Sequence, residues 1–105
     1  MDADAFRRMK KSAYLINAAR GPVVDQRALY SALVSGEIAG AATDVMEKEP
    51  LPADDPLLSI RDSGKLIITP HLAWASAEAR ERCVREVYED VAAFLRGEPR
   101  NVVNA

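Results

Sequence analysis

Three short apolar runs stand out from an otherwise polar chain. They occupy residues 13–18, 38–45 and 66–68, and each has the length of a buried strand. The first run, AYLINA, does not alternate with polar residues, which predicts a strand buried on both faces. A helical pattern separates the first two runs. This order, with near-continuous apolar strands, is typical of a parallel α/β sheet.

Three stretches have helical spacing. Residues 2–9 predict a short helix, capped by one of its two aspartates. A second helix should begin after Asp25 and end at Gly36, because these residue types favour the two helix ends. A long helix is expected from Ser76 to about Arg96. The apolar stripes of the two longer helices comprise Ala28, Leu29, Ala32 and Leu33, and Val84, Val87, Tyr88, Val91 and Leu95.

The predicted order is therefore helix, strand, helix, strand, loop, strand and long helix. The loop, residues 46–60, is rich in acidic residues and contains three prolines. Three strands are few for a parallel sheet, whose faces and edges need cover. The long helix also offers more apolar surface than three strands can easily bury. We therefore expect the chain to belong to something larger or to form a homo-oligomer.

Composition narrows the class of protein. The 105 residues suffice for one small domain, and the net charge of -2 gives no case for a nucleic acid or an anionic membrane as partner. No apolar run approaches the roughly 20 residues of a membrane span, and residues 1–11 do not resemble a signal peptide. The single cysteine, Cys83, excludes an internal disulfide and is interpreted as a packing residue. These features predict a cytoplasmic protein without a membrane partner.

Candidate chemistry gathers where the predicted strands end. Arg20, Asp44 and His71 each follow or close one strand, and Glu49 lies in the acidic loop. Because parallel strands direct their carboxyl ends to one side of a sheet, these side chains are expected to converge. A guanidinium binds a carboxylate through two parallel hydrogen bonds. A carboxylate orients a histidine, and a histidine so held can transfer a proton near neutral pH.

Plainer interpretations of the same residues stay open at this point. His71 can simply hold a loop together at a strand end, and Asp44 can cap a turn. The segment around Glu49 has the composition of a solvated surface loop. No metal site is predicted.

Several linked motifs carry a resemblance to a known family. Residues 15–25, LINAARGPVVD, resemble the INxxRGxxVD segment of D-isomer-specific 2-hydroxyacid dehydrogenases. The same holds for AGAATDV at residues 39–45 with Glu49-Pro50, for Thr69-Pro70-His71, and for the ending at residues 101–104. The family resemblance implies a Rossmann-like nucleotide-binding fold. It also implies NAD as cofactor, with NADP not excluded, and a small 2-hydroxy or 2-keto acid as substrate.

The resemblance also implies residue roles. Arg20 matches the arginine that holds the substrate carboxylate and carbonyl oxygen, and Glu49 matches the glutamate paired with the catalytic histidine. His71 matches that histidine, which protonates the keto oxygen as hydride arrives and removes the hydroxyl proton in reverse. The positions implied to line the nicotinamide are Ala18, Ala19, Arg20, Asp44, His71, Leu72, Ala73 and Trp74.

The segment HLAWAS, residues 71–76, most resembles the glycerate dehydrogenase/hydroxypyruvate reductase branch. Many family members have Gly-Gly where this chain has Ala73-Trp74, so a role for Trp74 in the substrate pocket stays open. Relatives with other chemistry are the phosphite and formate dehydrogenases and the corepressors. Glu49 argues against the formate enzymes, which have a different residue at that position.

The family's GxGxxG motif does not occur in these 105 residues. The resemblance therefore implies a partial Rossmann-like sheet, a C-terminal piece of the enzyme. Residues 1–75 would form the C-terminal half of the nucleotide-binding domain, and residues 76–105 the long helix and tail returning to the substrate domain. We expect the isolated chain to be inactive. The alternative is a non-catalytic binding or assembly module derived from the family.

Overall fold

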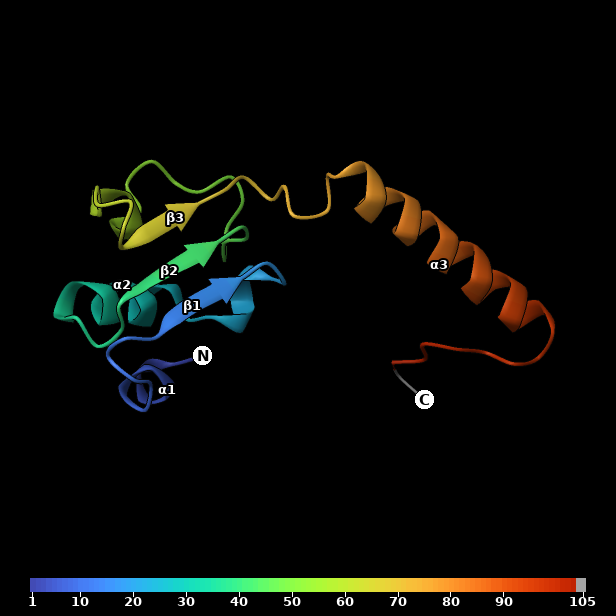
Figure 1. Cartoon of the computed structure of the whole chain (residues 1–105), viewed down its shortest axis with the longest axis horizontal. Coiled ribbons are helices and arrows are strands. Elements are labelled where there is room, and N and C mark those ends of the chain that lie inside the picture. The colour runs from blue at the N-terminus through green and yellow to red at the C-terminus, as the bar shows by residue number, and fades with distance from the viewer. Residues whose placement is uncertain (104–105) are drawn as a thin grey trace. The chain divides into compact units, whose positions relative to one another are not determined.

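The computed structural model describes residues 1–103, which form two compact units, Met1–Leu72 and residue 73 onward. The order of elements is the predicted one (Figure 1). In chain order they are α1 (Ala3–Arg7), β1 (Tyr14–Asn17), η1 (Gly21–Val23), α2 (Gln26–Ser35), β2 (Gly40–Thr43), η2 (Pro56–Ser59), β3 (Leu66–Ile68) and α3 (Ala77–Leu95).

The strands of the described residues form one parallel three-stranded sheet in the order β1-β2-β3 (Figure 1). The register places Ala42 of β2 between Ile16 of β1 and Ile67 of β3. The central strand consists of small residues. A Cβ on Gly40 would lie only 2.8 Å from the Tyr14 ring, so the first strand packs closely on the second. The predicted α/β class with parallel strands is confirmed.

Local signals define the helix ends as expected. The Asp2 side chain, rather than that of Asp4, accepts a hydrogen bond from the first turn of α1. Asp25 and Ser76 cap α2 and α3 in the same way, which satisfies backbone N–H groups that lack a partner within the helix. Gly36 ends α2 with a φ of 73°, a left-handed conformation that glycine adopts without a steric penalty.

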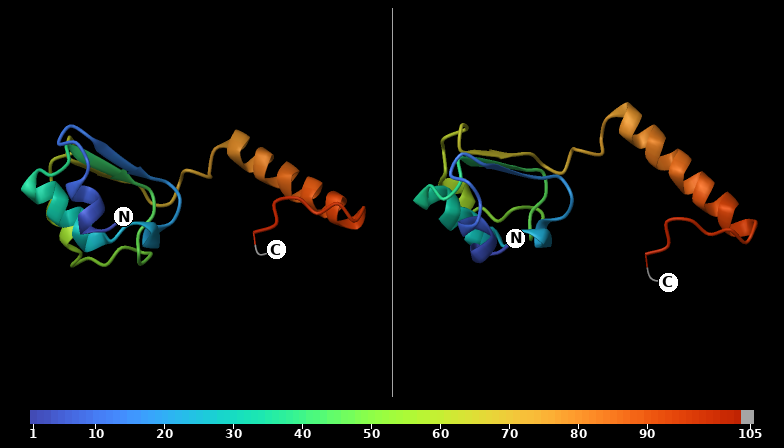
Figure 2. Two further views of the ribbon diagram at one scale, coloured as in Figure 1. Left: turned by 90° about the horizontal axis from the view of Figure 1, so that it is seen from below. Right: turned by 60° about the horizontal axis from the view of Figure 1, so that its bottom comes forward.

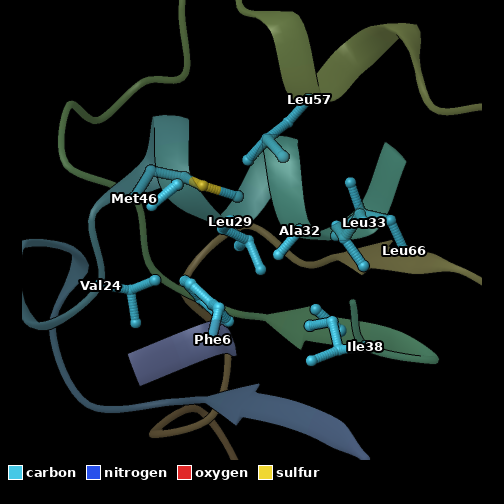
Figure 3. Packing of buried hydrophobic residues seen from close by; sticks show 11 residues of the cluster. Phe6, Val24, Leu29, Ala32, Leu33, Ile38, Met46, Leu57 and Leu66 are labelled. Carbon is cyan, nitrogen blue, oxygen red and sulfur yellow. The ribbon is translucent and has the colours of Figure 1, made fainter. Parts of the chain in front are cut away.

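The core lies on one face of the sheet. Figure 2 shows α1 and α2 on the same side of the three strands, and Figure 3 shows their apolar side chains meeting between helices and sheet. The predicted stripe of α2 is buried, and the loop returns to this core through Leu57 of η2. The core cluster comprises Phe6, Val24, Ala28, Leu29, Ala32, Leu33, Ile38, Ala41, Met46, Leu57 and Leu66.

The opposite face of the sheet corrects one prediction. β1 was expected to be buried on both faces, but Tyr14 is 64% exposed and Ile16 is 77% exposed. Ile67 of β3 lies in the same row and is 53% exposed. The helices of Met1–Leu72 cover only the other face of the sheet. The apolar run therefore identified a strand that needs cover on both faces, but this unit covers only one of them.

The second unit is built around α3, whose predicted apolar stripe is exposed along its length. The following tail folds back on the helix. Arg100 forms ion pairs with Glu86 and Asp90, and the Asn101 side chain donates a hydrogen bond to Asp90 at 3.0 Å. Cys83 is exposed, so its interpretation as a packing residue is wrong. Asn104, the last residue of the C-terminal motif, lies outside the described residues.

No helix among residues 1–103 is long and apolar enough to cross a bilayer.

Candidate active site

The loop that carries Arg20 is held by Asn17, the last residue of β1. The Asn17 side chain is buried; it donates a hydrogen bond to the Arg20 carbonyl oxygen at 3.0 Å and accepts one from the Ala19 N–H at 3.1 Å. The Asn17 carbonyl oxygen accepts the Asp44 N–H at 2.9 Å. The buried Asn17 amide therefore shapes the turn at the end of β1, and the Asn17 main chain connects this turn to the end of β2.

Gly21 brings this first loop against the loop that follows β2. A Cβ at Gly21 would lie 1.9 Å from the Met46 carbonyl oxygen, far inside any allowed contact. Only glycine permits so close a backbone approach. The Arg20 loop and the segment leading to Glu49 are therefore in direct main-chain contact.

The turn after β3 presents His71 with a φ of 56°, in the left-handed region that non-glycine residues seldom occupy. Asp44 holds this turn at several points. Its carbonyl oxygen accepts the His71 N–H at 2.8 Å, and its Oδ1 accepts the Leu72 N–H at 2.8 Å and the Thr69 hydroxyl. The bonds to Asp44 stabilise a sparsely populated backbone conformation at the histidine.

His71 and Glu49 form a pair. Nδ1 of His71 lies 2.8 Å from Oε2 of Glu49, and Oε1 of Glu49 accepts the Met46 N–H at 2.9 Å. An ionised carboxylate only accepts hydrogen bonds, so the proton of the pair is on Nδ1. This arrangement leaves Nε2 of His71 as the nitrogen that can exchange a proton with a bound molecule.

The pKa of the Glu49 carboxyl lies below its ordinary value of 4.5. The largest cause is the hydrogen bond from His71, followed by the one from the Met46 N–H, and the charge of Arg20 contributes least. Both side chains of the pair are about 40% exposed. Glu49 is therefore ionised at neutral pH and remains a hydrogen-bond acceptor for His71.

A cavity of about 420 Å³ opens beside the pair, at the carboxyl end of the sheet. Its walls are mostly apolar, with three ionisable side chains among them. It is lined by Asp44, Met46, Glu49, Pro50, Leu51, Ile68, Thr69, Pro70 and His71.

The structure thus brings Asp44, Glu49 and His71 together around one cavity. Arg20 lies in the adjoining loop, is exposed, and donates from Nη1 to the Ala19 carbonyl oxygen at 2.7 Å. It does not line this cavity, although its charge reaches Glu49. Ala18 is exposed beside it at the end of β1.

The remaining predicted positions follow β3. Leu72 is exposed and ends the first unit, next to His71. Ala73 and Trp74 belong to the second unit, where both are exposed. The side chains of Ala18 and Ala19 are small and exposed at the end of β1, which leaves room for a flat ring such as nicotinamide to approach.

Two residues that organise the site lie within the motifs but had no role assigned from the sequence. Asn17 shapes the Arg20 loop, and Thr69 donates to Asp44 below the histidine. An asparagine that ends an otherwise apolar strand was the available signal, because a buried amide requires hydrogen-bond partners.

Comparison with known proteins then decides the family. Residues 1–73 match the family model described as "D-isomer specific 2-hydroxyacid dehydrogenase, NAD binding domain". The chain belongs to this family. The resemblance drawn from the motifs is thereby confirmed, and so is NAD as the cofactor of the matched domain.

Two relatives illustrate the match. A glyoxylate reductase of Korarchaeum cryptofilum is 52% identical over 102 residues, which cover 96% of this chain and 30% of that protein. A glycerate dehydrogenase of Methylorubrum extorquens is 48% identical over 103 residues, which cover 98% of this chain and 32% of the relative. The chain therefore spans about a third of the length of these relatives.

A solved structure shows the same arrangement. The D-isomer specific 2-hydroxyacid dehydrogenase of Xanthobacter autotrophicus, in complex with NADPH and MES, superposes with a TM-score of 0.73 at 40% identity. The match covers 99% of this chain and 40% of that one. The Rossmann-like fold expected from the resemblance is confirmed. The NADPH bound in that structure agrees with the expectation from the motifs that NADP is not excluded as a cofactor of the family.

Proposed function

We propose that this chain supplies the acid–base and substrate-binding part of an NAD(P)-dependent dehydrogenase for a small 2-keto or 2-hydroxy acid. Glyoxylate and the hydroxypyruvate/glycerate pair are the leading candidates, because relatives with these names are about 50% identical. The observation that carries the proposal is the 2.8 Å contact between His71 Nδ1 and Glu49 Oε2 beside a cavity at the strand ends.

In this proposal His71 is the catalytic acid and base. Protonated on both nitrogens, it donates from Nε2 to the keto oxygen, and in the reverse direction Nε2 accepts the hydroxyl proton. Glu49 remains ionised and binds Nδ1–H, which fixes the ring orientation and stabilises the imidazolium. When bound, the cofactor supplies the hydride that the carbonyl carbon receives.

Arg20 would bind the substrate carboxylate. A guanidinium presents parallel N–H donors that match the two oxygens of a carboxylate. The position of the Arg20 main chain is set by the buried Asn17 amide and by the close contact of Gly21 with the Glu49 loop. These contacts support a fixed place for the Arg20 main chain beside the His71–Glu49 pair.

The cofactor would be held at its nicotinamide end. The proposed contacts are the Ala18–Arg20 main chain, Asp44 and the His71–Leu72 segment. Ala73 and Trp74 stay proposed contributors, either to this site or, for Trp74, to the substrate pocket. Asp44 would also have a second role, which is to hold the His71 turn through its carboxylate and carbonyl oxygens.

We also propose a division of the parent protein. Residues 1–75 would be the C-terminal half of its nucleotide-binding domain, and residues 76–105 the helix and tail that return to the substrate domain. Without a GxGxxG segment to bind the pyrophosphate, the 105-residue chain alone would not turn over. The exposed apolar stripe of α3 supports assembly with further protein surface, including a homo-oligomer.

The exposed apolar faces also favour the second candidate, a non-catalytic assembly module. The two are separated by isolating the gene product as its host makes it and measuring its mass. A product about three times the length of this chain that oxidises NADH or NADPH with glyoxylate or hydroxypyruvate supports the dehydrogenase. A product of 105 residues without activity supports the module.

Arg20→Lys sharpens this assay. We expect KM for the keto acid to rise by roughly 10- to 100-fold, because one strong charged hydrogen bond is lost. Arg27→Lys is the matched control, since Arg27 is exposed on α2. An unchanged KM in Arg20→Lys would contradict the assignment of Arg20.

A further inference from the structure

Gln26, the first residue of α2, makes several hydrogen bonds to the segment that carries Glu49. Its main-chain N–H donates to Oε1 of Glu47 at 3.0 Å, and its side-chain Oε1 accepts the Glu47 N–H at 3.2 Å. Its Nε2 donates to Oδ2 of Asp55 at 2.5 Å. One side chain thus reaches two points of the loop, at Glu47 and at Asp55.

The exchange with Glu47 follows from the chemistry of a helix end. The first N–H groups of an α-helix have no partner within the helix, and a negative charge there is favourable. Asp25 caps the Ala28 N–H, and the Glu47 carboxylate takes the Gln26 N–H. The reciprocal bond from the Glu47 N–H to the Gln26 amide aligns the loop main chain with the start of α2.

The two contact points lie on either side of Glu49. Glu47 precedes it by two residues, and Asp55 ends the stretch before η2. The other oxygen of Asp55 accepts the Leu57 N–H at 2.9 Å, and Leu57 is buried in the core. Gln26 therefore connects both ends of the loop to a helix that is itself packed in the core.

We propose that Gln26 is a positioning residue for the His71–Glu49 pair, acting through Glu47 and Asp55. The inference rests on the proposed function, because it assigns a purpose to holding Glu49 in place. Gln26 contacts neither His71 nor Glu49 in the bonds described, so its effect passes through the loop main chain.

The pair depends on such support because water can compete with it. Both side chains are about 40% exposed, and a hydrogen bond in that setting persists only where its two ends are held. The His71 end is held by the bonds of its turn to Asp44. The Glu49 side chain is held directly by the Met46 N–H, but its loop is largely solvent-exposed between Glu47 and Asp55, and Gln26 restrains that loop.

The test uses the full 105-residue chain and the fact that His71 is its only histidine. The ¹⁵N chemical shifts of the two ring nitrogens report which nitrogen carries the proton, without overlap from other residues. The variants are Gln26→Ala and Glu47→Ala, with Glu49→Gln as the reference for a lost pair. Ser31→Ala is the matched control, an exposed position on the same helix.

We expect Glu49→Gln to change the His71 ring shifts fully, and Gln26→Ala and Glu47→Ala to change them part-way in the same direction. Ser31→Ala should leave them unchanged. Hydrogen exchange of the Glu47 N–H should accelerate by about fivefold in Gln26→Ala, the loss of one net hydrogen bond of about 1 kcal/mol. The double variant should exceed either single effect, because Gln26→Ala removes the bonds of the Gln26 side chain and Glu47→Ala removes the separate bond to the Gln26 main-chain N–H.

The outcomes separate this inference from the proposed function. If Glu49→Gln alters the ring shifts while Gln26→Ala and Glu47→Ala do not, the pair stands and the role of Gln26 is overturned. If Glu49→Gln has no effect, the pair does not form in solution, and both fail. If Gln26→Ala does not fold, as judged by circular dichroism, Glu47→Ala decides alone, since it removes only the bond to the Gln26 main-chain N–H and keeps the Asp25 cap.

Discussion

The two units of the chain treat their apolar side chains in opposite ways. In Met1–Leu72, Phe6 and Leu33 are 0% exposed and belong to one continuous core. Among the described hydrophobic residues of α3, Ala93 alone is buried, while Leu95 is 78% exposed. The first unit therefore has an internal source of stability, and the second presents a stripe that requires another surface.

This difference bears directly on the candidate site. The His71 turn, the Glu49 loop and the Arg20 loop are all connected by hydrogen bonds or close packing within the first unit. Trp74 belongs to the second unit and is exposed. The contrast shows that the contacts of the His71–Glu49 pair are defined within the first unit, whereas the apolar stripe of α3 is exposed.

The largest expected effect separates His71 from Trp74. In the native gene product, His71→Asn should lower kcat/KM for the keto acid by about 10²- to 10⁴-fold, because a positioned proton donor is lost. Trp74→Phe should change mainly the preference between glyoxylate and hydroxypyruvate. The measurement is steady-state NADH or NADPH oxidation with both substrates. Equal losses in the two variants would break the contrast between the units.

The next effect compares a buried leucine of the first unit with an exposed leucine of α3. Leu33→Ala should lower the free energy of unfolding by about 2–5 kcal/mol, because it leaves a cavity in a fully buried site. Leu95→Ala should change it by less than about 0.5 kcal/mol, as expected of an exposed position. Urea denaturation of the 105-residue chain, followed by circular dichroism, tests both. A large loss in Leu95→Ala would show that the stripe is already covered in solution.

The pH dependence of stability tests the pair. Because the folded-state pKa of Glu49 is lowered, its contribution is present above the ordinary value of 4.5 and is lost as pH falls through the lowered folded-state value. The difference in unfolding free energy between wild type and Glu49→Gln should therefore shrink as pH falls below 4.5. Urea titrations at several pH values measure it. His71→Asn should reduce the same difference, since His71 is its largest cause.

The smallest effect is expected in the second unit. Arg100→Ala removes the ion pairs to Glu86 and Asp90, which are partly exposed and contribute about 0.2–1 kcal/mol. Helicity by circular dichroism should fall slightly, and less so in high salt. Arg96→Ala, whose ion pair to Glu98 is longer at 3.8 Å, is the control and should change less.

Local patterns predicted the elements well. Caps at Asp25 and Ser76, the stop at Gly36 and the stripe of α2 are properties of neighbouring residues, so the sequence alone determines them. The order of elements and the parallel sheet followed from the same patterns. The motifs around Arg20, Glu49 and His71 also sufficed to indicate the family, which the matched domain confirms.

Only the tertiary structure decided which face of β1 is covered, because an apolar run does not say what packs on it. It also decided that Asp44 holds the His71 turn and that Gln26 reaches the Glu49 loop across 21 and 29 residues of sequence. Such contacts join residues that no local pattern connects. These contacts form because polar groups at loop ends require hydrogen-bond partners, and the folded chain decides where each partner lies.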